Sequence, residues 1–228
     1  MTMDVTVLRV FTDVDRKFGN ALGVVESSSA TAQSRQRLAA QLGFSETIFI
    51  DPPKPGSFTA RAHIFTPAVE LPFAGHPAVG AAWWLRARGM PVHALDLPAG
   101  IVEVDYVGEL SVVSVFVEWT PEFVIHDLDT PQDVLEANPD EYFDDFPHYL
   151  WAWVNKSEGH IRSRSFAPEL GVDEDEATGA AAVRITEYLG RDLTVTQGKG
   201  SVIRTWWRPD GWIQIGGHVR REGLTRVT

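Results

Sequence analysis

The sequence predicts a mixed α/β (α+β) protein made of two similar halves. Short runs of β-branched and apolar residues alternate with a few helical segments. Two of these helices are rich in small residues: they open with Gly75-His76-Pro77-Ala78-Val79 and Gly179-Ala180-Ala181-Ala182-Val183, about a hundred residues apart. We therefore expect one half over residues 1–119 and a shortened second half over 120–228, whose last strand is able to return to the first half.

The first half is expected to contain four strands, two helices and a hairpin. Strand-like runs lie at residues 5–12, 22–25, 47–50 and 62–65. Residues 30–42 predict a helix that ends at Gly43, where a left-handed glycine would stand. Residues 77–88 predict a second helix that is apolar almost all round, which indicates burial on every side. A hairpin is expected from residues 101–106 and 110–119, with its turn at Val107-Gly108-Glu109.

The second half is expected to follow a polar connection. Residues 120–147 hold four prolines and many acids, and Thr130-Pro131-Gln132-Asp133 is typical of a helix start. We interpret this stretch as an interdomain connection that carries one short helix. Helix 178–189 is expected to end at Gly190, and strands are expected at residues 149–154, 161–166, 202–207 and 212–215.

Composition excludes several classes of function. The 228 residues include no cysteine, so no disulfide, thiolate nucleophile, Cys-ligated zinc or two-thiol racemase is possible. Twenty basic and 31 acidic residues give a formal charge of −11, which disfavours nucleic-acid binding. No apolar stretch reaches 18 residues and no leader is evident, so we expect a soluble cytoplasmic protein with no membrane association.

Two residues of the first half are candidates for proton transfer. Glu46 lies between an apolar helix and an apolar strand, where partial desolvation would raise the pKa of its carboxyl group. The alternative is a solvated strand edge. His76 stands at the start of the buried helix, whose positive end suits a carboxylate. The alternative there is a capping or buried structural histidine.

The third candidate is Asp175, one of four consecutive acids at residues 173–176 that precede the second small-residue helix. Interaction with the helix dipole explains most of these acids, but Asp175 is able to point into a site between the halves. The acids lack the spacing of a calcium loop, and no His-Glu-x-x-His motif occurs. We therefore expect no metal.

Four segments together resemble the phenazine-biosynthesis PhzF-like family. They are Gly43-Phe44-Ser45-Glu46-Thr47, Glu70-Leu71-Pro72-Phe73-Ala74-Gly75-His76-Pro77, Arg164-Ser165-Phe166-Ala167-Pro168 and Glu174-Asp175-Glu176-Ala177-Thr178-Gly179, and Gly19-Asn20 and Gln197-Gly198 fall in matching order. The resemblance implies the diaminopimelate-epimerase-like fold, in which each half is a curved sheet around a central helix. It also implies a cofactor-independent homodimeric isomerase that acts on a small, cyclic or unsaturated carboxylate.

The resemblance also implies roles for individual residues. Glu46 matches the glutamate that takes and returns the proton, His76 shares its site, and Asp175 orients the substrate. The remaining positions are expected to bind substrate: Gly75, Gly179, Ala180, Asn20 and Ser45.

The sequence departs from the family pattern at several places, including a short turn at Lys199-Gly200-Ser201 and Ala21 after Gly19-Asn20. Ala180 stands where the family commonly has serine, Glu176 stands where it has proline, and the second half is short. These departures keep an alternative open, namely an inactive family member that binds small carboxylates or acts as an interaction protein.

Overall fold

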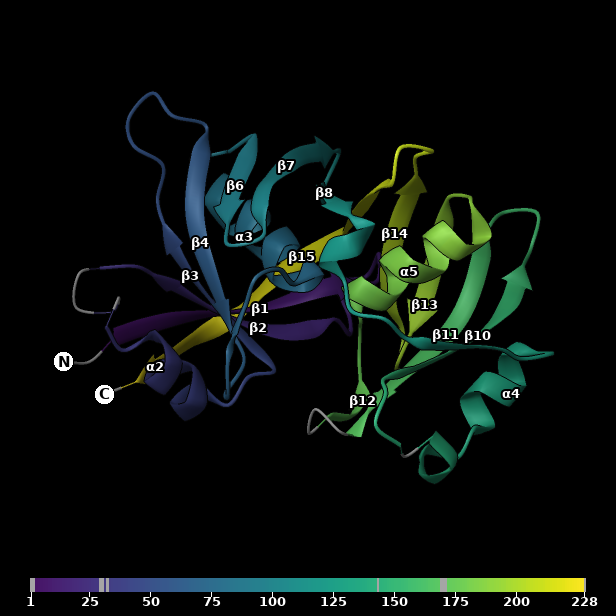
Figure 1. The fold of residues 1–228 in the computed structure, drawn as a ribbon. Coiled ribbons are helices and arrows are strands. Elements are labelled where there is room, and N and C mark those ends of the chain that lie inside the picture. Colours follow the sequence, from purple (N-terminus) through teal and green to yellow (C-terminus); the bar gives the residue numbers. More distant parts are fainter. Residues whose placement is uncertain (1–2, 29–30, 32, 143, 169–171, 228) are drawn as a thin grey trace.

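In the computed structural model, the described residues are 3–28, 31, 33–142, 144–168 and 172–227. Within these ranges, fifteen strands join one strongly curved sheet that serves both halves. Figure 1 shows the halves side by side, each with a helix against the sheet. This arrangement confirms the mixed α/β fold class with two repeated halves.

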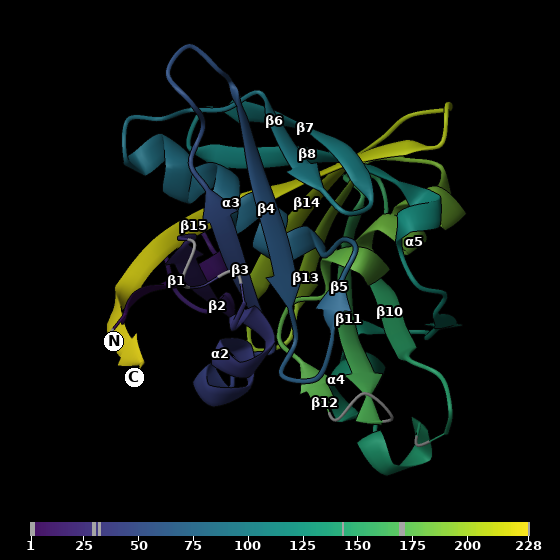
Figure 2. The same cartoon turned by 60° about the vertical axis from the view of Figure 1, so that its left-hand side comes forward.

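The strands of the first half surround one helix. They pair in the order β1 (Met3–Thr12), β2 (Asn20–Glu26), β3 (Glu46–Asp51), β4 (Thr59–Phe65), β6 (Ala94–Leu97), β7 (Gly100–Val107), β8 (Leu110–Phe116) and β15 (Trp212–Val227), with the two-residue β5 (Glu70–Leu71) on β4. Because β15 pairs with both β8 and β1, these strands form a closed ring. Helix α3 (Gly75–Ala87) lies inside this ring, and α2 (Arg35–Leu42) lies outside near the chain ends (Figures 1 and 2).

Close packing fixes α3 within the ring. Its residues from Gly75 to Ala82 are all buried, as the apolar sequence predicts. At Gly80 an added Cβ would lie 2.4 Å from Leu22 Cδ2 and 3.0 Å from Val10 Cγ2, so only glycine lets the helix approach β1 and β2 this closely.

The second half is an open sheet between two helices. From β15 the pairing runs through β14 (Ser201–Trp207), β13 (Leu193–Gln197), β11 (His160–Ala167), β10 (His148–Asn155) and β9 (Val124–Asp127), and β12 (Val172–Asp175) pairs with β11. Helix α5 (Gly179–Leu189) packs on one face and α4 (Pro131–Glu136) contacts β10 and β11 from the other. Along β10, Tyr149 and Trp151 join the main core, whereas Leu150 and Ala152 pack beneath α4 with Val134.

The structure corrects some expected elements. The last strand continues to Val227 instead of stopping at residue 215, and residues 218–227 pair with β1. The connection at 120–147 contributes strand β9 to the sheet, in addition to the expected helix α4, so it is more than a linker. Helix α2 begins at Arg35, and the first residue of the predicted helix, residue 30, lies outside the described residues, as do residues 169–171.

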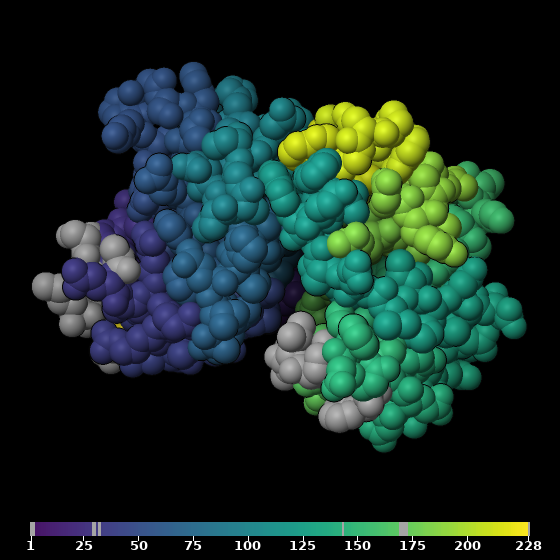
Figure 3. Space-filling view, in the orientation of Figure 1, coloured from purple at the N-terminus to yellow at the C-terminus, as the bar shows by residue number. Residues whose placement is uncertain are grey.

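The division at residues 119 and 120 stays a prediction, because β15 is shared by both halves. In space-filling form, the surface is hollowed between the purple-to-blue lobe and the green lobe (Figure 3).

Candidate active site

The N-termini of α3 and α5 meet at two glycines. A Cβ added to Gly75 would lie 3.3 Å from Gly179 Cα, and one added to Gly179 would lie 3.4 Å from the His76 backbone nitrogen. No described side chain caps either helix start, because neither Ala74 nor Thr178 makes a side-chain cap hydrogen bond. The first-turn N–H groups of two helices therefore converge, and both helix dipoles place positive potential at this point.

Glu46 and His76 lie together beside these helix starts. Glu46 is the first residue of β3, and its Oε2 atom lies 3.5 Å from His76 Nε2. Both atoms are buried, and neither has a hydrogen-bond partner within the described part of the chain. The Glu46 side chain is 19% exposed and the His76 side chain 5%, so the carboxyl group is the more accessible of the two. The solvated-edge alternative for Glu46 is thereby wrong.

Asp175, the last residue of β12, reaches the same site from the second half. Its Oδ1 accepts a hydrogen bond from Asn20 Nδ2 at 2.7 Å, and its Oδ2 accepts one from Thr178 Oγ1 at 2.7 Å. The charge of Glu46 raises the pKa of Asp175 and that of His76 lowers it, so the three groups lie within electrostatic range of one another. The structure thus brings together the three side chains that the sequence singled out as catalytic candidates, Glu46, His76 and Asp175.

Burial perturbs all three groups. It raises the pKa of the Glu46 carboxyl, an effect that a hydrogen bond with Ser45 partly opposes. It lowers the pKa of His76 to about 4, against the attraction of Asp175 and a hydrogen bond to the Ala21 backbone. Burial, and then the charge of Glu46, raise the pKa of Asp175. His76 is therefore neutral at neutral pH, and the two carboxyl groups hold their protons more tightly than carboxyl groups in water.

The predicted substrate-binding residues divide into two groups. Gly75, Gly179 and Ala180 form the converging helix starts. Asn20 and Ser45 instead contact the acids, because Asn20 donates to Asp175 and Ser45 bonds with the Glu46 carboxyl. The substrate-binding role of these two side chains stays a prediction.

Sequence reasoning noted Gln197 as a match to the family pattern and Glu176 as a departure from it, but gave neither residue a part in the site. Gln197 is fully buried at the end of β13, and its Nε2 donates to the Asp175 backbone oxygen at 2.9 Å and to Thr178 Oγ1 at 2.8 Å. Glu176 accepts from the backbone nitrogen of Lys199 and from Ser201 Oγ. One signal for Gln197 was available in the sequence. In the alternating run Leu193–Gln197, residue 197 falls on the same face as Leu193 and Val195, which places a polar side chain among buried ones.

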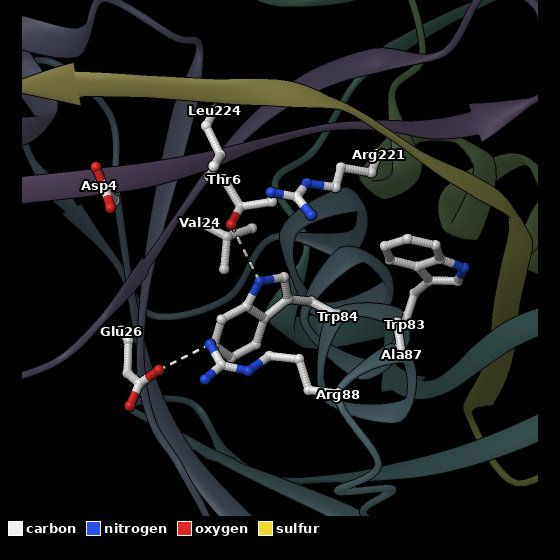
Figure 4. A pocket seen from close by; sticks show the side chains of 10 residues that line it. All are labelled: Asp4, Thr6, Val24, Glu26, Trp83, Trp84, Ala87, Arg88, Arg221 and Leu224. Carbon is white, nitrogen blue, oxygen red and sulfur yellow. Dashed lines mark hydrogen bonds and ion pairs between the residues drawn. The ribbon is translucent and has the colours of Figure 1, made fainter.

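A separate cavity of about 470 Å³ lies at the other end of α3 (Figure 4). There the Arg88 guanidinium stacks over the Trp84 ring at 4.3 Å and pairs with Glu26 at 2.8 Å. The described residues include no group of three or more His, Cys, Asp or Glu side chains placed to hold a metal ion. In the same ranges, no helix is long and apolar enough to cross a membrane.

Comparison with known sequences identifies relatives over most of the chain. The model of the family described as "Phenazine biosynthesis-like protein" matches residues 8–120 and 109–206. Trans-2,3-dihydro-3-hydroxyanthranilate isomerase of Pseudomonas chlororaphis is 30% identical over an alignment of 210 residues, and the match covers 76% of this chain and 75% of that protein. An uncharacterized isomerase of Pasteurella multocida is 39% identical over 89 residues, but that match spans only 38% of this chain and 31% of the relative.

Solved structures share the fold at low identity. A PhzF-family protein from Enterococcus faecalis is 19% identical, with a TM-score of 0.77 over the whole of both chains. A probable proline racemase from Agrobacterium radiobacter is 11% identical, with a TM-score of 0.58, and covers 99% of this chain and 93% of its own. The family model and the Pseudomonas chlororaphis relative show that the chain belongs to the phenazine biosynthesis-like, or PhzF-like, protein family.

Proposed function

We propose that the chain is an isomerase that moves a proton within a small, cyclic or unsaturated carboxylate, with Glu46 as the acid and base. The observation that carries this proposal is the meeting of two uncapped helix starts at Gly75 and Gly179, beside the buried pair Glu46 and His76. The relatives named trans-2,3-dihydro-3-hydroxyanthranilate isomerase support the reaction class.

The geometry supports a division of labour. Backbone N–H groups at Gly75–His76 and Gly179–Ala180 would hold the substrate carboxylate, since Pro77 has no N–H and directs the anion to the first two residues of α3. That contact would fix the reacting carbon beside Glu46. Neutral His76 would form a hydrogen bond with the Glu46 carboxyl group. Asp175 would orient the substrate from the other half.

A raised carboxyl pKa suits this task. A carboxyl group with a raised pKa is a stronger base once ionised, and it keeps a proton to return at a pH nearer neutrality. One group that removes and returns a proton on the same face suffices for isomerisation. The chain has no cysteine, so proton transfer by a pair of thiols on opposite faces is excluded.

The test is deuterium incorporation during turnover of trans-2,3-dihydro-3-hydroxyanthranilate in D₂O. We expect the wild-type protein to convert the compound and Glu46→Gln to lose at least about a thousandfold in rate, while far-ultraviolet circular dichroism stays unchanged. Glu70→Gln, which alters a partly exposed acid that pairs with His63, serves as the matched control. Turnover in Glu46→Gln at the wild-type rate would refute the assignment of Glu46.

The alternative is a family member that binds small carboxylates without turning them over, and Ala180 motivates it because the helix start there offers no hydroxyl group. Binding of anthranilate by calorimetry, together with no conversion or deuterium exchange in the wild-type protein, would favour this alternative. Detectable conversion would remove it.

A further inference from the structure

A second bridge between the halves lies beside Asp175. The Gly19 backbone nitrogen donates to Ser201 Oγ at 2.9 Å, and Ser201 Oγ donates to Glu176 Oε1 at 2.7 Å. The neighbouring residue, Asn20, donates to Asp175 Oδ1 at 2.7 Å. Two consecutive residues of the first half are thus tied to two consecutive acids of the second.

The Glu176 carboxylate is held firmly in this bridge. The Lys199 backbone nitrogen lies 3.1 Å from each of its oxygens, so the turn at 198–200 grips it from one side. Gly198 has a positive φ of 56°, and a Cβ there would lie 2.5 Å from Glu176 Oε2, so glycine is what allows the turn to close on the carboxylate. Arg162 donates to the Gly198 carbonyl oxygen and interacts electrostatically with Glu176.

We propose that Glu176 is a positioning residue, which with Ser201 holds Asn20 against Asp175 and so aligns the acid of the second half with Glu46 and His76. This inference rests on the proposed function only in taking these three residues as the reacting set. It needs no contact between Glu176 and the substrate. Its physical basis is that catalytic groups supplied by two halves must be kept in register, and a misplacement of about 1 Å is able to cost a hundredfold in rate.

Removing the Glu176 side chain is expected to lower kcat but to leave KM almost unchanged. The helix starts that would hold the carboxylate remain intact when Glu176 is removed, so KM is expected to change little. Glu176→Ala is expected to lower kcat about tenfold and to change KM less than about threefold. Glu176→Gln retains an oxygen that accepts from Ser201 but loses one acceptor for Lys199, so it should lie between Glu176→Ala and the wild type. Asp173→Ala, at an exposed acid of β12 three residues before Glu176, is the matched control and should behave as the wild type.

The experiment combines NMR with kinetics on trans-2,3-dihydro-3-hydroxyanthranilate. In Glu176→Ala we expect amide hydrogen exchange at Gly19 to accelerate at least about tenfold, and the side-chain amide signal of Asn20 to shift. Unchanged Gly19 and Asn20 signals, or changed signals with an unchanged kcat, would overturn the proposal. If the wild-type protein does not turn over the compound, the proposed function fails, and the bridge is judged on the Gly19 and Asn20 signals alone.

Discussion

The perturbed histidine makes a quantitative prediction about stability. Because burial lowers the pKa of His76 to about 4 in the folded protein, its protonation on unfolding favours the unfolded state as the pH falls from about 6.5 toward 4. The stabilisation by neutral His76 is complete above pH 6.5 and is lost below it. The pKa of His76 differs by about 2.5 pH units between the unfolded and the folded protein. This difference lowers the free energy of unfolding by about 2 to 3 kcal/mol between pH 7.5 and pH 4.5.

The assay is urea unfolding of the wild type and of His76→Gln at pH 7.5 and pH 4.5. Glutamine is neutral at both pH values. The free energy of unfolding of the variant should therefore fall by about 2 to 3 kcal/mol less on acidification than that of the wild type. Groups remote from His76, including the other histidines, cancel in this difference, whereas the loss of its charge acts on Asp175 as well. His160→Gln, at a less buried histidine, is the control and should show a smaller effect. Equal acid losses in the wild type and in His76→Gln would refute the reasoning.

Three further predictions concern the helix starts, the bridge and the periphery. Gly179→Ala should lower the urea-unfolding free energy by about 1 kcal/mol, because its Cβ would lie 3.3 Å from the Gly75 backbone; a more stable variant would contradict the close approach. Asn20→Ala should slow turnover about 10- to 100-fold, since it removes a 2.7 Å hydrogen bond to Asp175, and wild-type kinetics would count against that role. Thr130→Ala breaks the capping box of α4 and should cost about 1 kcal/mol in thermal unfolding, with turnover unchanged; slower turnover would link α4 to the site.

The local elements were predictable where one pattern dominates. The apolar, small-residue composition of residues 77–88 indicated a buried helix, and α3 is buried on nearly every side. The capping signal at Thr130-Pro131-Gln132-Asp133 gave the start of α4 correctly. In contrast, the second part of β15 carries Arg220, Arg221 and Glu222, and these charges conceal a strand that is held by its pairing with β1.

The site was predictable only in part, because its contacts join distant segments. Four neighbouring acids at residues 173–176 all suit a helix start, yet Asp175 turns toward Asn20, which is 155 residues away. The choice among those acids depends on strand register in β12 and on the Gln197 side chain, neither of which local periodicity encodes. Glu176 looked like a departure from the family pattern, whereas in the structure it bonds to the 198–201 turn.

The proposed function depends on the two helix starts holding a carboxylate beside Glu46. A crystal structure with bound 3-hydroxyanthranilate would test this contact. We predict that the carboxylate accepts hydrogen bonds of about 2.7 to 3.2 Å from backbone nitrogens at both Gly75–His76 and Gly179–Ala180, with the ring against the Glu46 carboxyl group. A carboxylate bound elsewhere, such as in the cavity beside Trp84 and Arg221, with the helix starts unoccupied, would contradict it.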